Sequence, residues 1–293
     1  MKKSIGIAAS AFVLMVLLSA PAGAGGDGHP MLVAMNEQLA EMGMDVRVEY
    51  AEYITGSEGP EFGQTIYANH RGNKQLSADW VPGDPRRYGV NEILWTTDQV
   101  DMTSDVPDVG DVNAAIGRAM KTWQDVQCST IPLVEVPDYG YDWGYVQYLL
   151  GFGGTPGWFA DFTEAGWLPG GFFDAIEPGG SGYILGATFT FVWTNSDMDG
   201  NGKSDVAFRE VYYNDAFYWS VVGPGIDIET VVLHEAGHGL SQAHFGKIFQ
   251  SGNGKVHFSP RAVMNAAYSG VQRELTGTDV GGHCSIWGSW PNN

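Results

Sequence analysis

The chain has 293 residues, 44% of them hydrophobic, which is enough for one large domain with appendages or for two small ones. Its formal net charge at pH 7 is −19, from 15 basic and 34 acidic residues, so it lacks the basic face that nucleic acid needs, and cations are better partners. Beyond the N-terminus, no segment approaches the ~20 apolar residues of a membrane-spanning helix, which argues against a membrane-embedded protein.

Residues 1–24 have the pattern of a secretory signal peptide. Two lysines precede an apolar run at residues 5–18 that is too short to span a bilayer comfortably, and residues 20–24 offer small side chains for cleavage. We therefore expect a secreted mature protein, in a periplasm or outside the cell. In an oxidising compartment Cys128 and Cys284 are expected to form a disulfide, two buried thiols being the alternative.

Residues 25–88 form a polar lead-in to the main domain. They contain an apparent helix at residues 31–42 and a strand at residues 45–53, where apolar and polar side chains alternate. Two prolines and a glycine within residues 80–87 indicate a boundary or linker. We interpret the lead-in as an N-terminal extension or a removable pro-segment.

The main domain is expected to begin with a short strand at residues 93–95 and a core helix, whose apolar residues recur at spacings of three and four between residues 111 and 126. Further strands are predicted at residues 131–136, 184–193 and 208–214. Pro132 indicates an edge position for the first of these. The glycine- and aromatic-rich residues 139–183 have no clear period, and we interpret them as a packed irregular insertion, the alternative being a substrate groove that stacks against sugars.

The loop at residues 197–205 resembles the first part of a calcium-binding loop. Oxygen-bearing side chains stand at its first, third, fifth and ninth positions, and a glycine at the sixth makes the sharp turn. These side chains belong to Asp197, Asp199, Asn201 and Asp205. The twelfth position holds Phe208 where a glutamate is expected, so a solvated turn remains the alternative to a calcium site.

The strongest motif lies at residues 234–244. On a helix, His234 and His238 share one face, which suits two imidazoles that converge on one tetrahedral zinc ion. His244 can return as the third ligand if the helix ends before it, and the fourth position then stays open for water. Glu235 sits beside the metal as a general base. The spacing therefore predicts a catalytic zinc, ordinary histidines being the alternative.

The helix that carries this motif is predicted at residues 228–240, with Asp227 as its N-cap. Gly237 and Gly239 cost the helix about 1 kcal/mol each relative to alanine. Its stability must therefore come from packing and from the metal, and the two glycines let neighbouring groups approach closely.

Together with residues 259–268, the motif resembles the metzincin metalloproteases, and most closely the matrixin-type catalytic domain. In that family a methionine-containing turn lies beneath the metal, and an aromatic residue four positions later forms part of the specificity pocket. Met264 and Tyr268 match these two positions. Over residues 89–293 the resemblance implies an α+β fold with a twisted, mainly parallel sheet, a long core helix, an active-site helix and a C-terminal helix.

This sequence also departs from the family pattern. Ser241 stands where metzincins usually have the glycine that turns the chain toward the third ligand, so either serine adopts that backbone shape or the turn differs. Ala266 replaces the usual matrixin proline. No histidine lies between Cys128 and His234, so the second, structural zinc of animal matrixins is not expected, and the thiol-based latency motif is absent.

The sequence thus predicts a secreted zinc-dependent endopeptidase that acts on a protein or peptide substrate, with Zn²⁺ and a possible Ca²⁺ as cofactors. One alternative is an exported, metal-stabilised binding module, for example for polysaccharide. Another is a zinc hydrolase that acts on cell-wall peptide or an ester. If residues 25–88 are a pro-segment, they could cover the cleft, with a carboxylate such as Asp84 facing the zinc.

Overall fold

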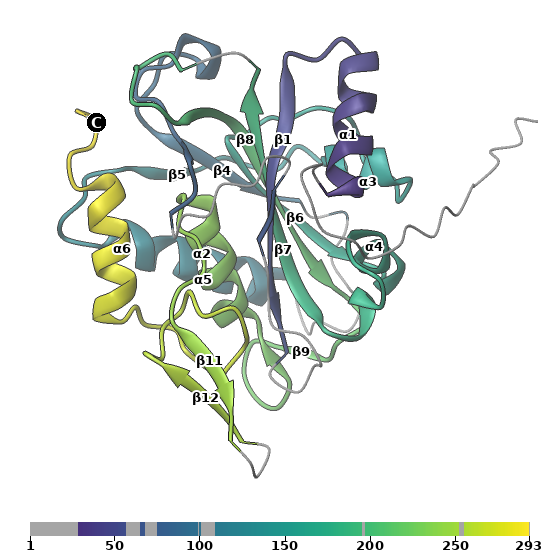
Figure 1. Cartoon of the computed structure of the whole chain (residues 1–293), viewed down its shortest axis with the longest axis vertical. Helices are drawn as coiled ribbons and strands as arrows, with labels where there is room; N and C mark the ends of the chain where they lie inside the picture. The colour runs from purple at the N-terminus through teal and green to yellow at the C-terminus, as the bar shows by residue number, and fades with distance from the viewer. Residues whose placement is uncertain are drawn as a thin grey trace, which may run out of the picture.

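The computed structural model describes residues 29–56, 65–67, 75–98, 100, 109–194, 197–251 and 255–292 (Figure 1). The predicted signal peptide at residues 1–24 lies outside the described residues. Within them, every helix is too short or too polar to cross a membrane.

A mixed β-sheet forms the centre of the fold (Figure 1). Its strands are β1 (Val46–Thr55), β2 (Thr65–Tyr67), β3 (Ala78–Asp79), β4 (Ile93–Thr97), β5 (Leu133–Glu135), β6 (Phe162–Leu168), β7 (Ile184–Trp193) and β8 (Ser204–Asn214). Seven of them follow the order β2-β1-β7-β8-β6-β4-β5, and β3 pairs with the start of β8. The pairs β1–β2, β1–β7 and β7–β8 are antiparallel, and the other described pairs in this sheet are parallel. The fold is therefore α+β as predicted, and its sheet is mixed where the resemblance implied a mainly parallel one.

Helices cover both faces of the sheet. In the described part of the chain they are α1 (Pro30–Glu41), α2 (Val109–Gln124), α3 (Tyr145–Leu150), α4 (Gly170–Ile176), α5 (Ile228–Gly239) and α6 (Gly277–Trp287), with short 3₁₀ turns η1 (Pro85–Arg87) and η2 (Gly180–Gly182). One core, which includes Trp123 and Trp287, packs α2, α5 and α6 against the sheet. The other, which includes Leu32 and Phe172, packs α1, α3 and α4 on the opposite side (Figure 1).

Two small sheets complete the fold. β9 (Trp219–Ser220) and β10 (Ile226–Asp227) are parallel, and β11 (Lys247–Gln250) and β12 (Val256–Ser259) form an antiparallel hairpin. β9 and β10 lie shortly before α5, and the hairpin lies between α5 and α6.

Most of the predicted elements are present, with ends that differ by a few residues. The predicted helices at residues 31–42 and 111–126 are α1 and α2, and the predicted strand at residues 184–193 is β7. The sequence does not predict β6, which crosses the segment interpreted as irregular. All seven residues of β6 are buried, so the alternation that marks a half-exposed strand is missing.

Several aromatic side chains of residues 139–183 pack inward, whereas those of Tyr139, Tyr141 and Tyr148 are exposed. Trp158 stacks on Phe208 with ring centroids 4.6 Å apart. Trp167, Phe172 and Phe173 are at most 4% exposed. These contacts favour the packed interpretation of this segment over an exposed groove that binds sugars.

The N-terminal lead-in contributes directly to the sheet. β1 pairs antiparallel with β7 along its whole length. In the segment predicted as a linker, Trp80 is fully buried, and Arg87 forms a buried ion pair with Asp161, with Nε and Oδ1 2.7 Å apart. Residues 80–87 therefore pack as part of the fold.

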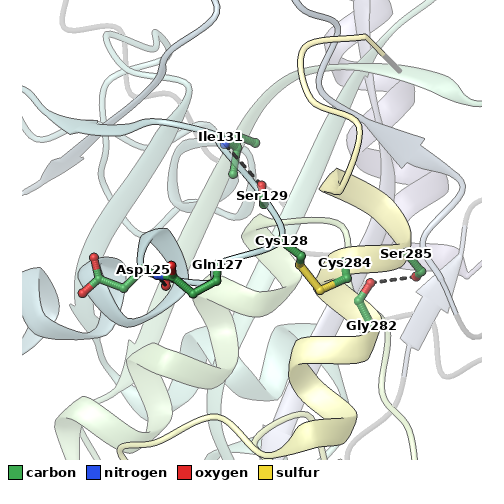
Figure 2. Close-up of a disulfide and its surroundings, with 8 residues drawn as sticks. All are labelled: Asp125, Gln127, Cys128, Ser129, Ile131, Gly282, Cys284 and Ser285. Atoms are coloured by element: carbon green, nitrogen blue, oxygen red, sulfur yellow. Dashed lines mark hydrogen bonds between the residues drawn. A yellow bond between two sulfur atoms is a disulfide. The ribbon is translucent and has the colours of Figure 1, made fainter.

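Cys128 and Cys284 form a disulfide, as predicted (Figure 2). Their Cα atoms lie 5.7 Å apart, and 156 positions separate them in the sequence. The bond joins the chain just after α2 to α6. It therefore fixes α6 to the end of α2, the helix that packs against α5.

Candidate metal centre

The histidine motif lies on α5, which is buried along its whole length. Asp227 caps the helix as predicted, because its carboxylate accepts a hydrogen bond of 2.9 Å from the Thr230 backbone N–H. All twelve helical residues are buried. Packing on every side therefore offsets the low helix propensity of Gly237 and Gly239.

Side chains from three other parts of the chain satisfy the carbonyl groups at the end of α5. The Gly239 carbonyl accepts hydrogen bonds from Trp80 Nε1 (3.1 Å) and from Arg209 Nη1. The Leu240 carbonyl accepts a hydrogen bond of 2.8 Å from Trp287 Nε1. The last carbonyls of a helix have no partner within the helix. These bonds therefore stabilise an abrupt end to α5, where the chain turns toward the third histidine.

The three predicted histidines converge on one point. The Nε2 atoms of His234, His238 and His244 lie 3.0–3.1 Å from one another. His234 and His238 are fully buried, and His244 is partly exposed. Zinc–nitrogen bonds are about 2.0–2.1 Å long, so one ion can bind all three nitrogens. This group could therefore hold a metal ion such as zinc.

Hydrogen bonds show which ring nitrogens are free to bind the ion. Nδ1 of His234 lies 2.7 Å from the Val263 carbonyl, and Nδ1 of His238 lies 2.7 Å from the Gln242 carbonyl. Because a carbonyl only accepts, each Nδ1 carries the proton and each Nε2 presents a lone pair. Burial lowers the pKa of His234 to about 4 and the pKa values of His238 and His244 well below the usual value, so all three rings are neutral at pH 7. Lone pairs that face one another at this distance repel unless a cation lies among them, so the donor set fits a metal.

Glu235 is fully buried beside the histidines. Thr188 Oγ1 donates a hydrogen bond of 2.6 Å to its Oε2, and its Oε1 has no hydrogen-bond partner among the described residues. Gly186 of β7 makes room for the carboxylate, since a Cβ there would lie 3.2 Å from Oε1. Burial raises the pKa of Glu235 to about 8, and the nearby Glu164 adds to the shift. One oxygen of this carboxylate is thus free to exchange a proton.

Met264 packs directly on the motif helix. A Cβ added to Gly237 would lie 2.3 Å from the Met264 sulfur, so only a glycine at that position allows this contact. The backbone N–H groups of Val263 and Met264 donate to the two oxygens of the Asp279 carboxylate, each at 3.1 Å. Asp279 therefore fixes both the methionine and the carbonyl that orients His234. The sequence does not predict this role of Asp279.

Ser241 forms the turn that brings His244 back to the other histidines. Its φ angle is 64°, in the left-handed region that favours glycine. Its Oγ accepts a hydrogen bond of 2.9 Å from Arg209 Nη2. Serine therefore adopts the backbone shape that the family gives to glycine, and a buried arginine holds it there.

This turn gives a testable difference between two small substitutions. Ser241→Gly removes the backbone strain and the hydroxyl together, so we expect the free energy of unfolding to change by less than about 1 kcal/mol. Ser241→Ala keeps the strain and leaves Arg209 with one bond fewer, which costs about 1–3 kcal/mol. Denaturant unfolding of the full chain measures both changes. Equal losses in the two variants would contradict this account of the turn.

Tyr268 lies near the start of α5. Its hydroxyl accepts a hydrogen bond of 3.2 Å from the Asp227 backbone N–H, and its own N–H donates to the Thr55 carbonyl at 2.7 Å. It lines a small cavity of ≈ 10 Å³ together with Ile54 and Ala267. Its assignment to a specificity pocket stays a prediction.

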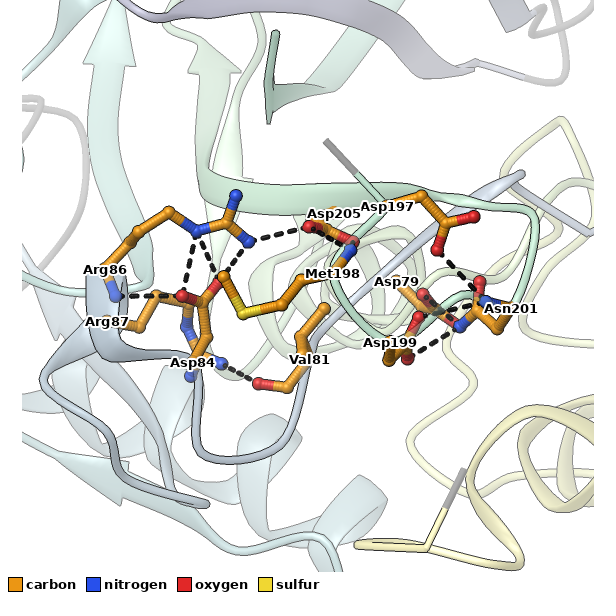
Figure 3. Close-up of polar contacts among 10 residues, drawn as sticks. All are labelled: Asp79, Val81, Asp84, Arg86, Arg87, Asp197, Met198, Asp199, Asn201 and Asp205. Atoms are coloured by element: carbon orange, nitrogen blue, oxygen red, sulfur yellow. Dashed lines mark hydrogen bonds and ion pairs between the residues drawn. The ribbon is translucent and has the colours of Figure 1, made fainter. Parts of the chain in front are cut away.

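The loop predicted to bind calcium forms a compact acidic turn (Figure 3). Carboxylate oxygens of Asp197, Asp199 and Asp205 lie within 4.8 Å of one another. Asn201 adds its side chain to this cluster by donating from Nδ2 to Asp199 Oδ2 at 2.9 Å. The structure therefore brings all four predicted residues together.

Two further carboxylates belong to this region. Asp79 reaches the loop because β3 pairs with the start of β8, and it lies 2.7 Å from Lys203 Nζ. The sequence gives no signal for this long-range contact. Asp84, considered above as a group facing the zinc, instead forms an ion pair of 2.6 Å with Arg86, which also pairs with Asp205 (Figure 3). Asp84 is therefore linked through Arg86 to the acidic loop, and its proposed position at the zinc is wrong.

Comparison with protein-family models finds no match for this chain, and comparison with curated proteins finds no significantly similar one.

Proposed function

We propose that the protein is a secreted zinc-dependent endopeptidase of the metzincin type, with His234, His238 and His244 as zinc ligands and Glu235 as the general base. One observation carries the proposal: three Nε2 atoms 3.0–3.1 Å apart lie beside a buried carboxylate, one oxygen of which has no hydrogen-bond partner in the described part of the chain. A structural zinc has no chemical need for such a carboxylate, whereas hydrolysis needs a base.

The chain's own groups suit the steps of peptide hydrolysis. Zinc, when bound, supplies a Lewis acid that acidifies water and polarises a carbonyl group. Glu235 takes a proton at Oε1 as water attacks the peptide carbonyl and delivers it to the leaving amine. Thr188 holds the carboxylate in one orientation through Oε2. Burial raises the pKa of Glu235 to about 8, which by itself favours the protonated form. A cation beside the carboxylate lowers this pKa and so favours the ionised form at neutral pH.

Export is part of the proposal. The Cys128–Cys284 disulfide is consistent with an oxidising compartment, where such bonds persist. The pattern of residues 1–24 supports the same location. We therefore propose that the mature protein acts in a periplasm or outside the cell.

Metal content and substrate cleavage test the proposed function together. We expect the purified protein to hold about one catalytic zinc per chain and to cut casein or gelatin, with new peptide termini identified by mass spectrometry. A chelator should stop the cleavage, and added zinc should restore it. Hydrolysis of cell-wall peptides or esters without cleavage of casein or gelatin would mean that the protein is a zinc hydrolase with another class of substrate. Zinc binding without hydrolysis of any of these substrates would favour the metal-stabilised binding module and contradict the proposal.

We also propose that Ca²⁺ binds at Asp197, Asp199, Asn201 and Asp205. A divalent cation would relieve the repulsion among these carboxylates, so calcium should raise the melting temperature of the zinc-saturated protein by about 2–4 °C for each kcal/mol of binding. Asp199→Ala should abolish this shift, whereas Asp125→Ala, at an exposed carboxylate elsewhere, should keep it. Calcium-dependent melting that survives Asp199→Ala would mean that the loop is only a turn.

A further inference from the structure

The end of β1 is held between two backbone edges. On one side, Ile54 pairs with Gly186 of β7 in the antiparallel register. On the other side, the Thr55 N–H donates to the Ala266 carbonyl (3.3 Å), and the Thr55 carbonyl accepts from the Tyr268 N–H (2.7 Å). An extended peptide segment thus fills a slot whose two walls are made of backbone groups.

This slot runs past the candidate general base. β1 passes beside α5 and β7 (Figure 1). Thr188, which donates to Glu235, pairs with Glu52 of β1. A peptide backbone of the chain itself therefore lies where Glu235 would meet a substrate.

The Ile54 side chain packs at the wall of a small pocket that adjoins the histidine group. Ile54 is 2% exposed, and it lines the pocket together with Val263, Ala267 and Tyr268. The space left is ≈ 10 Å³, about enough for one water. Val263 also supplies the carbonyl that orients His234, so pocket and metal group share a wall.

We propose that residues 54 and 55 are an internal ligand of the peptide-binding site. A substrate peptide binds in their place, extended and antiparallel to β7, with an apolar side chain where Ile54 now lies. The intact chain is therefore latent until this strand end is displaced. This inference rests on the proposed peptidase function, and it adds to that function the regulation of the site and a substrate class.

The walls of the slot explain why its ligand is a peptide. Backbone N–H and C=O groups along both edges match the alternating donors and acceptors of an extended chain, as in the addition of a strand to a sheet edge. The Ile54 pocket then selects an apolar side chain. A sugar or an anion would leave most of these backbone groups without partners.

Only the end of β1 is suited to move. Val46, Val48, Ala51 and Tyr53 are at most 2% exposed and pack in the core that contains Leu32, on the far side of the sheet. β2 also pairs with residues 50–52. The ends of secondary-structure elements open at lower free energy than their buried middles. The displacement therefore involves residues 54 and 55, while the rest of β1 stays in the sheet.

We call the end of β1, in its place in the peptide-binding site, the latch. Two matched variants test the latch by its effect on activity. Ile54→Ala enlarges the pocket, so we expect kcat/KM of the zinc-loaded full chain for a fluorogenic peptide to rise about tenfold as the open state becomes more populated. Val48→Ala also removes a branched, buried side chain from β1, but from the opposite core. It should lower the melting temperature without raising kcat/KM. An Ile54→Ala chain that is no more active than Val48→Ala would count against the latch.

Binding of a peptide tests the latch without turnover. In a zinc-loaded Glu235→Gln background, a fluorescent peptide with the sequence of residues 46–55 should bind Ile54→Ala about tenfold more tightly than the chain with Ile54 in place. Fluorescence polarisation gives the dissociation constants, and a peptide of scrambled sequence is the control. Equal affinities for the two chains would overturn the latch, whatever the activity assays give.

A disulfide lock covers the case in which Ile54→Ala does not fold. Thr55 and Ala267 are paired in a parallel bridge, so Thr55→Cys with Ala267→Cys places two thiols side by side. The oxidised double variant should bind the peptide at least about tenfold more weakly than either single-cysteine variant. Unchanged binding in the locked chain would overturn the latch. If peptide binding changes as predicted but no variant hydrolyses a peptide, the proposed function is overturned, whereas the inference that the end of β1 is an internal ligand stands.

Discussion

Replacing Glu235 with glutamine is expected to lower kcat for peptide hydrolysis about 10²–10⁴-fold while zinc stays bound. Glutamine keeps the shape of the side chain and can still accept the hydrogen bond from Thr188. It cannot take up a proton at neutral pH, so the attacking water has no base. Zinc binding should persist because the substitution changes none of the three Nε2 atoms.

Glu229→Gln is the matched control for this experiment. Glu229 lies on the same helix, is 5% exposed and pairs with Arg118 at 2.7 Å, outside the histidine group. Hydrolysis by Glu229→Gln should remain near that of the parent chain. If the two variants have equal kcat at equal zinc content, Glu235 is not the base.

His238→Ala should abolish tight zinc binding and strongly lower stability. It removes one of three ligands and leaves the Gln242 carbonyl without its hydrogen bond, which by itself costs about 1–3 kcal/mol. It also removes the stabilisation from bound zinc, which is about 4 kcal/mol when free zinc exceeds the dissociation constant 1,000-fold. Zinc titration and thermal melting with and without zinc measure both effects.

His283→Ala separates these effects from the simple loss of a buried imidazole. His283 is fully buried, stacks on Trp123 with ring centroids 5.5 Å apart, and lies outside the histidine group. Its replacement should lower the melting temperature but leave zinc-dependent stabilisation intact. If His238→Ala keeps this stabilisation, the three histidines do not form the zinc site.

Local geometry explains which parts of the site can be predicted from the sequence. His234 and His238 must share a helix face at their spacing, and Asp227 caps the same helix through a bond three residues away. His244 follows shortly after the end of the same helix. Its convergence depends on Ser241 adopting a positive φ, which the sequence allows without requiring it.

The remaining parts depend on contacts between distant segments. Thr188 reaches Glu235 from β7, and Asp279 reaches Val263 from α6, so neither has a local signal in the sequence. β6 is buried on both faces and has no alternating pattern. The alternation in residues 45–53 does predict a strand. The pairing of this strand with β7 beside Glu235 depends on how distant segments pack, which the local sequence does not determine.

X-ray absorption at the zinc edge of the zinc-loaded full chain tests the central claim most directly. We predict a zinc ion with three imidazole nitrogen ligands at about 2.0–2.1 Å and a light atom in the remaining position. His244→Ala should reduce the imidazole count by one. A spectrum dominated by carboxylate oxygens, unchanged in His244→Ala, would place the zinc elsewhere, for example at the acidic loop around Asp199, and would contradict the account.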